Sequence, residues 1–190
     1  MAAGQYSLTV NGVSGALGAS TSIALTITAT GGGTLPCGVS VTPSAGSGAV
    51  GVAQNLQFVW ASPAGQPGIG SSSIIIQDSA LAAPGSANSC YLSVRTTGAT
   101  TPADDTGLNF SSNSWVGYGY AASPSNSQCQ LNAPASSFVA VTNGGSSEQV
   151  TLNLVFKAAW AGKTLAIWLQ SQNTNYKSGA WLQLGAFAVQ

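Results

Sequence analysis

The chain alternates apolar and polar residues along three consecutive segments near its C-terminus, and this pattern restricts the fold more than any other feature. A period of two places alternate side chains on opposite faces of an extended strand. The apolar sets are Val150, Leu152, Leu154 and Phe156 in residues 148–157, Leu165, Ile167 and Leu169 in residues 163–172, and Trp181, Phe187 and Val189 in residues 181–190. Three antiparallel strands with one apolar face are not stable alone, so we expect a second sheet to cover that face.

Short strand-like segments separated by turn residues fill the rest of the chain, and no stretch has the apolar spacing of an amphipathic helix. We therefore predict an all-β fold: a two-sheet antiparallel β-sandwich, immunoglobulin-like or jelly-roll-like, with almost no helix. A single domain is expected over residues 1–190. Two interpretations stay open for residues 1–36, which are poorer in aromatic residues: an extra strand pair, or N-terminal strands exchanged with a neighbouring copy.

Charged residues are scarce, with four basic and four acidic side chains and no histidine in 190 residues. They make up 4% of the chain, against about a quarter in typical soluble domains. We therefore expect neither nucleic acid nor an anionic membrane surface as a partner, because binding to either requires a basic patch. The net charge of zero favours self-association. A surface of neutral hydroxyl and amide groups is typical of secreted, wall-associated or assembling proteins.

The ends and apolar runs of the chain bear on its location. No run of about 18 apolar residues is present, so no membrane span is expected. The start, MAAGQYSLTV, lacks the basic segment and the long apolar segment of a signal peptide. We expect a mature or excised form of an extracellular or cell-surface protein.

An ordered set of segments begins at about residue 41. These segments are VTPSAGSG (41–48), QNLQFVWASPAG (54–65), SSSIIIQDS (71–79), CYLSV (90–94), DDTGL (104–108), NSQCQL (126–131), NGGSSEQVTLNLVFK (143–157), AGKTLAIWLQSQ (161–172) and SGAWLQLGAFAV (178–189). In order and spacing they resemble an immunoglobulin-like β-sandwich module of large secreted bacterial proteins, over about three quarters of the chain. The resemblance implies a fold and an extracellular compartment, and little about activity.

The chain has three cysteines, Cys37, Cys90 and Cys129. The resemblance implies a disulfide between Cys90 and Cys129, which requires an oxidising compartment. Two buried free thiols are the alternative, since a free cysteine packs like a small apolar residue. For Cys37 we expect a partly buried free thiol, and the alternative is a bond to another chain.

Several common arrangements of catalytic residues are excluded by the composition of the chain. Without histidine, neither a Ser-His-Asp nor a Cys-His arrangement can form, and three cysteines do not complete a zinc site. Asp104 and Asp105 are neighbours that would point apart on an extended chain, and with Gly107 they are typical of a turn. The alternative is that Asp104 and Asp105 are calcium ligands, helped by Thr106 and by backbone carbonyl groups. We predict a protein that is not an enzyme and has no cofactor.

Aromatic residues gather in the segment NSWVGYGYA, which contains Trp115, Tyr118 and Tyr120. Burial in the core or in a loop is the common fate of such residues. The alternative is an exposed platform that stacks on sugar rings, with amide side chains binding the sugar hydroxyls.

Strand edges offer another contact surface, because few lysines are available to guard them. Segments such as residues 21–29 and 71–77 would pair with another chain if they lay at an edge. The sequence thus favours a non-enzymatic, extracellular structural or adhesive β-sandwich that self-assembles through strand edges. Its partners would be other copies of itself or neighbouring domains. The alternative is a carbohydrate-binding module, with polysaccharide as the partner.

Overall fold

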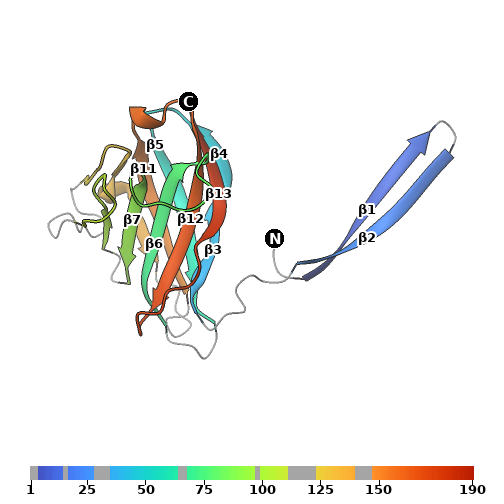
Figure 1. Ribbon diagram of the computed structural model, residues 1–190, viewed down its shortest axis with the longest axis horizontal. Coiled ribbons are helices and arrows are strands. Elements are labelled where there is room, and N and C mark those ends of the chain that lie inside the picture. The colour runs from blue at the N-terminus through green and yellow to red at the C-terminus, as the bar shows by residue number, and fades with distance from the viewer. Residues whose placement is uncertain are drawn as a thin grey trace. The chain divides into compact units, whose positions relative to one another are not determined.

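A computed structural model describes residues 4–14, 17–27, 35–63, 68–96, 99–110, 123–139 and 147–190. The chain divides into two units, Met1–Gly33 and Thr34–Gln190. In the first unit, β1 (Gly4–Ser14) and β2 (Leu17–Ile27) form an antiparallel two-stranded ribbon (Figure 1). Their register runs without a shift along the whole length of both strands.

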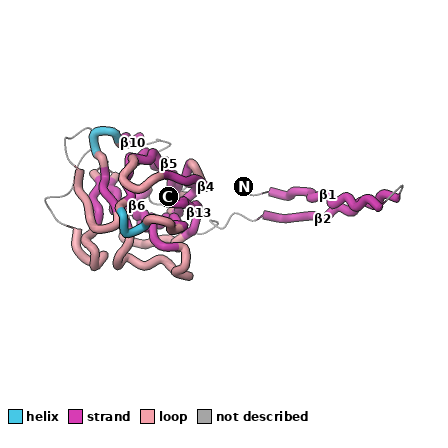
Figure 2. Tube along the Cα trace, turned by 90° about the horizontal axis from the view of Figure 1, so that it is seen from above, coloured by secondary structure: helices cyan, strands magenta, loops and turns pink. Residues whose placement is uncertain are grey.

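The second unit consists of two sheets packed face to face (Figure 1). The five-stranded sheet contains β10 (Ser137–Val139), β11 (Ser147–Phe156), β5 (Ala53–Ala61) and β3 (Cys37–Thr42) in that order, with β9 (Cys129–Leu131) also paired to β11. The six-stranded sheet has the order β4 (Ala45–Gly48), β13 (Leu182–Val189), β12 (Thr164–Asn173), β6 (Ile69–Asp78), β7 (Cys90–Arg95) and β8 (Thr100–Pro102). Figure 2 shows how little helix accompanies these strands. In the described residues it amounts to the 3-10 helices η2 (Ala133–Ala135) and η3 (Ala158–Trp160). The predicted all-β sandwich is confirmed.

One segment of the chain contributes to both sheets. β3 pairs with β5 in the first sheet, the chain passes through the cis Thr42–Pro43 bond, and β4 then joins the second sheet. There β4 pairs with the last strand, β13, in parallel, whereas the other strand pairs are antiparallel in the part of the chain that is described. This switch joins the two layers along one side of the sandwich.

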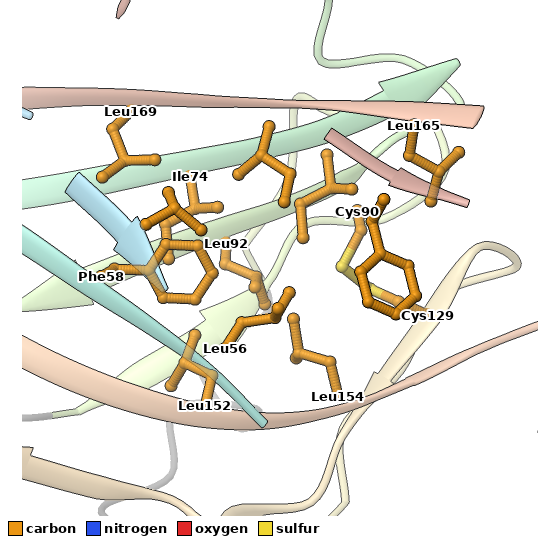
Figure 3. Packing of buried hydrophobic residues seen from close by; sticks show 14 of the residues in the cluster. Leu56, Phe58, Ile74, Cys90, Leu92, Cys129, Leu152, Leu154, Leu165 and Leu169 are labelled. Atoms are coloured by element: carbon orange, nitrogen blue, oxygen red, sulfur yellow. A yellow bond between two sulfur atoms is a disulfide. The ribbon is translucent and has the colours of Figure 1, made fainter. Parts of the chain in front are cut away.

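The core lies between the two sheets, and apolar side chains from both fill it (Figure 3). Leu56 and Phe58 of β5 and Leu152 and Leu154 of β11 come from one layer, while Ile74, Leu92, Leu165 and Leu169 come from the other. All of these side chains are completely buried. The alternation along residues 148–157 and 163–172 therefore marks the inward faces, as predicted.

The three C-terminal strands do not form one sheet, contrary to the simplest interpretation of the sequence. β11 belongs to the five-stranded sheet, whereas β12 and β13 are neighbours in the six-stranded sheet. The turn around η3 carries the chain across the core. Alternation defines which face of a strand is buried and does not define which strand lies beside it.

Trp181 also departs from the expected pattern, which placed it on the same side as Phe187 and Val189. The register between β12 and β13 shifts between Ile167 and Trp168, where Ile167 pairs with Gly185 and Trp168 pairs with Gln183. Leu184 is the extra residue of this β-bulge, and a bulge reverses the facing of all residues beyond it. Trp181 consequently contacts Tyr91 on the outer side of the sheet, whereas Phe187 and Val189 are buried in the core.

Candidate functional site

Cys90 and Cys129 form a disulfide, as the resemblance implied, with their Cα atoms 5.5 Å apart. Cys90 begins β7 in one sheet and Cys129 begins β9 in the other, so the bond links the two layers through the core (Figure 3). Both cysteines are completely buried. Cys37 is a free, partly buried thiol, and burial raises its pKa.

Asp105 joins the loop before β9 to the loop after β8. Its carboxylate accepts hydrogen bonds from the backbone N–H of Ser127, at 2.8 Å, and from the Ser127 hydroxyl. These bonds lower the pKa of Asp105. The segments DDTGL and NSQCQL, which are separate in the sequence, therefore contact each other directly.

Asn126, the residue before Ser127, completes this connection. Its side-chain amide donates to the carbonyl oxygens of Ser89 and Ala103, and its side-chain oxygen accepts from the backbone N–H groups of Gln128 and Cys129. Asn126 is buried, so each of these bonds satisfies a group that water does not reach. The bonds fix Cys129 directly opposite the segment that carries Cys90.

Asp104 closes a local turn instead. Its carboxylate accepts from the Thr106 hydroxyl at 2.6 Å and from the Asn109 side-chain amide at 2.8 Å. These bonds lower the pKa of Asp104 to about 2. Gly107 adopts a positive φ in this turn. Among the described residues, no three His, Cys, Asp or Glu side chains come together as a metal site would require.

The predicted platform residues Trp115, Tyr118 and Tyr120 lie outside the described residues. The structure does bring together another set of rings, on the outer face of the six-stranded sheet. Tyr91 contacts Phe110 and Trp181 edge to face, with ring centroids 5.0 and 6.4 Å apart. All three side chains are partly exposed. Aromatic rings held in this way can stack on an apolar surface of a ligand.

Strand register extends this aromatic face. Trp168 of β12 pairs with Ile75 of β6, and Ile75 pairs with Tyr91 of β7, which places the three residues in one row across the sheet. Ile75 is only 3% exposed although it faces outward, so this face has its own covering layer of side chains. The sequence did not predict this cluster, although the alternation along CYLSV indicates that Tyr91 lies opposite the inward Leu92.

A second unpredicted cluster surrounds a buried carboxyl group at Glu148. Its Oε2 accepts a hydrogen bond from the Ser72 hydroxyl at 2.9 Å, across the space between the two sheets. Trp60 is the register partner of Glu148, and Ser171 is the register partner of Ser72. Glu148 Oε1, Trp60 Nε1 and Ser171 Oγ are also buried, without a hydrogen-bond partner among the described residues. The alternation from Val150 back to Glu148 is the signal that could have found this group.

Burial raises the pKa of Glu148, and the hydrogen bond from Ser72 opposes part of that rise. The folded protein thus holds this proton more tightly than the unfolded chain, whose glutamic acid has the ordinary pKa of 4.5. The stability that depends on the neutral carboxyl group is present below that value and is lost as pH rises through the folded-state pKa.

We expect the Glu148→Gln variant, whose amide is neutral at every pH, to gain stability relative to the wild type as pH rises. Between the unfolded and folded pKa values, the difference in free energy of unfolding should change by up to about 1.4 kcal/mol per pH unit. Urea unfolding of both proteins from pH 4 to pH 8 measures this difference. Parallel stability curves would contradict the prediction.

Comparison with known proteins gives no relative whose function could be transferred to this chain. No helix in the described residues is long and apolar enough to cross a membrane. No family model, curated protein or solved structure matches the chain.

Proposed function

We propose that this chain is a non-enzymatic, extracellular β-sandwich module with a structural or adhesive role, which assembles with other copies or with neighbouring domains. The observation that carries the proposal is the use of its acidic side chains. Asp105 and Asp104 hold loops, Asp78 forms an ion pair with Lys163 at 2.9 Å, and Glu148 is buried. Three of these carboxyl groups are held in loop hydrogen bonds or an ion pair and the fourth is buried between the sheets, which supports a protein that acts by binding.

Strand order supports an immunoglobulin-like module. Variable-type immunoglobulin sandwiches have strands ABED in one sheet and C′ and C″ added beside GFC in the other. The order β3-β5-β11-β10 matches the first sheet, and β13-β12-β6-β7-β8 matches the second. The disulfide departs from the antibody pattern, because it joins β7 and β9 where antibody domains join strands B and F.

An oxidising, extracellular location agrees with the disulfide, because such bonds persist in secreted and cell-surface proteins and are rare in reducing compartments. The near absence of charge agrees with a protein that contacts neutral surfaces or its own copies. Sedimentation and negative-stain imaging of the whole chain across a range of concentrations test the assembling role. A strictly monomeric particle at high concentration would contradict that role.

Carbohydrate binding is a second candidate, favoured by the contact of Tyr91 with Phe110 and Trp181 on the outer face of the six-stranded sheet. Affinity electrophoresis in gels that contain neutral polysaccharides provides the test. Retardation by a glycan should be lost in Trp181→Ala and kept in Tyr176→Ala, since Tyr176 is 83% exposed and belongs to no ring cluster among the described residues. Equal migration with and without every glycan would eliminate this candidate.

A further inference from the structure

Four polar side chains meet in the space between the two sheets, at one end of the core. Trp60 and Glu148 are register partners in the five-stranded sheet, and Ser72 and Ser171 are register partners in the six-stranded sheet. Register partners have Cβ atoms about 5 Å apart on the same face of a sheet. The hydrogen bond from the Ser72 hydroxyl to Glu148 Oε2, at 2.9 Å, holds one pair opposite the other. The four residues therefore form one group, with two members from each layer.

Solvent does not reach this group. Each of the four residues is at most 4% exposed. β6 and β12, which carry the two serines, are inner strands of their sheet, so the segment 71–77 does not lie at an edge. Three atoms of the group, Glu148 Oε1, Trp60 Nε1 and Ser171 Oγ, nevertheless have no hydrogen-bond partner among the described residues. Because burying a polar atom without a partner is costly and rare in native proteins, these atoms point to a small molecule held between the sheets.

The hydrogen-bonding abilities of the three atoms select the kind of molecule. The indole N–H of Trp60 can only donate, so the molecule must accept a hydrogen bond, which excludes a metal cation or an ammonium ion. An anion would lack a positive partner, since none of the four residues of the group is basic.

Water fits the three atoms in either protonation state of the carboxyl group. Glu148 Oε1 accepts a hydrogen bond when the group is ionised and donates one when it carries the proton, while the Ser171 hydroxyl can do either. A water molecule accepts two hydrogen bonds and donates two, and buried waters in proteins typically make about three. The polar atoms of the site match this number.

We propose that Trp60, Glu148 and Ser171 form the binding site of one internal water molecule, which bridges the two sheets. The water accepts a hydrogen bond from Trp60 Nε1 and also binds Glu148 Oε1 and Ser171 Oγ. The disulfide joins the layers beside Phe156, at the other end of β11. The water joins them at the Glu148 end, together with the hydrogen bond from Ser72.

A crystal structure of the whole wild-type chain, at a resolution that shows ordered solvent, tests the site directly. It should show one water within hydrogen-bond distance of Trp60 Nε1, Glu148 Oε1 and Ser171 Oγ. Direct hydrogen bonds among these three atoms, or a site that is dry, would overturn the proposal.

Oxygen-17 magnetic relaxation dispersion counts internal waters in solution and allows a matched comparison. Ser171→Val replaces the hydroxyl by a larger apolar group, so the dispersion amplitude should fall by the contribution of one water. Ser93→Val makes the same change on the outer face of the same sheet and should leave the amplitude unchanged. Equal amplitudes in the wild type and in Ser171→Val would contradict the proposal.

A second pair of variants, at Glu148, keeps the test decisive if Ser171→Val does not fold. Glu148→Gln preserves the size of the side chain and its ability to bind water, so the dispersion amplitude should stay at the wild-type value. Glu148→Met is similar in size but apolar, so the amplitude should fall by one water. The same amplitude in these two variants would mean that Glu148 does not bind the water.

Discussion

Replacing Cys90 and Cys129 together by alanine should lower the free energy of unfolding by about 4 kcal/mol. The two cysteines are separated by 39 positions in the chain, and closing a loop of this length removes conformational entropy from the unfolded state. In the folded state, both residues are completely buried and Asn126 already holds the backbone of Cys129 in place. The native structure should therefore survive the change while its margin of stability falls.

Urea unfolding followed by tryptophan fluorescence measures this loss. The Cys37→Ser variant serves as the reference for the doubly substituted chain in the same background, because it removes exchange between the free thiol and the disulfide. A reductant should reproduce the effect in the Cys37→Ser protein and change nothing in the triple variant. A loss below about 1 kcal/mol would mean that the unfolded chain is already restricted in this region.

Gly107→Ala should destabilise the sandwich by at least about 3 kcal/mol, since it combines two costs. Gly107 has φ of 70°, a conformation that is unfavourable for alanine. A Cβ atom at this position would also overlap the backbone carbonyl group of Ser86. The segment around Ser86 would have to move, and it precedes Ser89, whose carbonyl oxygen accepts a hydrogen bond from Asn126.

Gly162→Ala is the matched control for this prediction. Gly162 has φ of 74°, and a Cβ atom there would meet no atom within 4 Å. Replacing Gly162 by alanine should lower the free energy of unfolding only by the cost of placing alanine at a positive φ, about 1–2 kcal/mol. Equal losses of stability in the two variants would show that the close approach of Ser86 to Gly107 does not matter in solution.

The sequence predicts well which face of a strand is buried, and poorly which strands pair with each other. Alternation along residues 148–157 identifies the buried side of β11, but β12 does not pair with it, because the chain crosses the core at η3. Trp181 was assigned to the wrong side, since a bulge at Leu184 changes the facing of the residues before it. A bulge depends on how two strands fit together, and a single strand sequence does not contain that information.

The side-chain contacts divide in the same way into those that the sequence predicts and those that only the structure shows. The disulfide between Cys90 and Cys129 followed from the resemblance, and the turn at Asp104 followed from local turn chemistry. The contact of Asp105 with Ser127 and the meeting of Tyr91 with Trp181 join residues that are distant in the chain, so only the fold reveals them. Glu148 is different, because its inward position continues the alternation of Val150 along the same strand.

The parallel pairing of β4 with β13 has a mechanical consequence. If the sandwich is pulled from its N-terminal and C-terminal ends, the two parallel strands are drawn in opposite directions along their own axes. The backbone hydrogen bonds that hold them, from Ala186 to Ser44, from Gln190 to Gly48 and from Val50 to Gln190, then share the load and must break together. A module whose terminal strands are loaded in shear should resist extension, because its hydrogen bonds break together and not one after another. Once these strands separate, the disulfide would still keep the segment between Cys90 and Cys129 from extending.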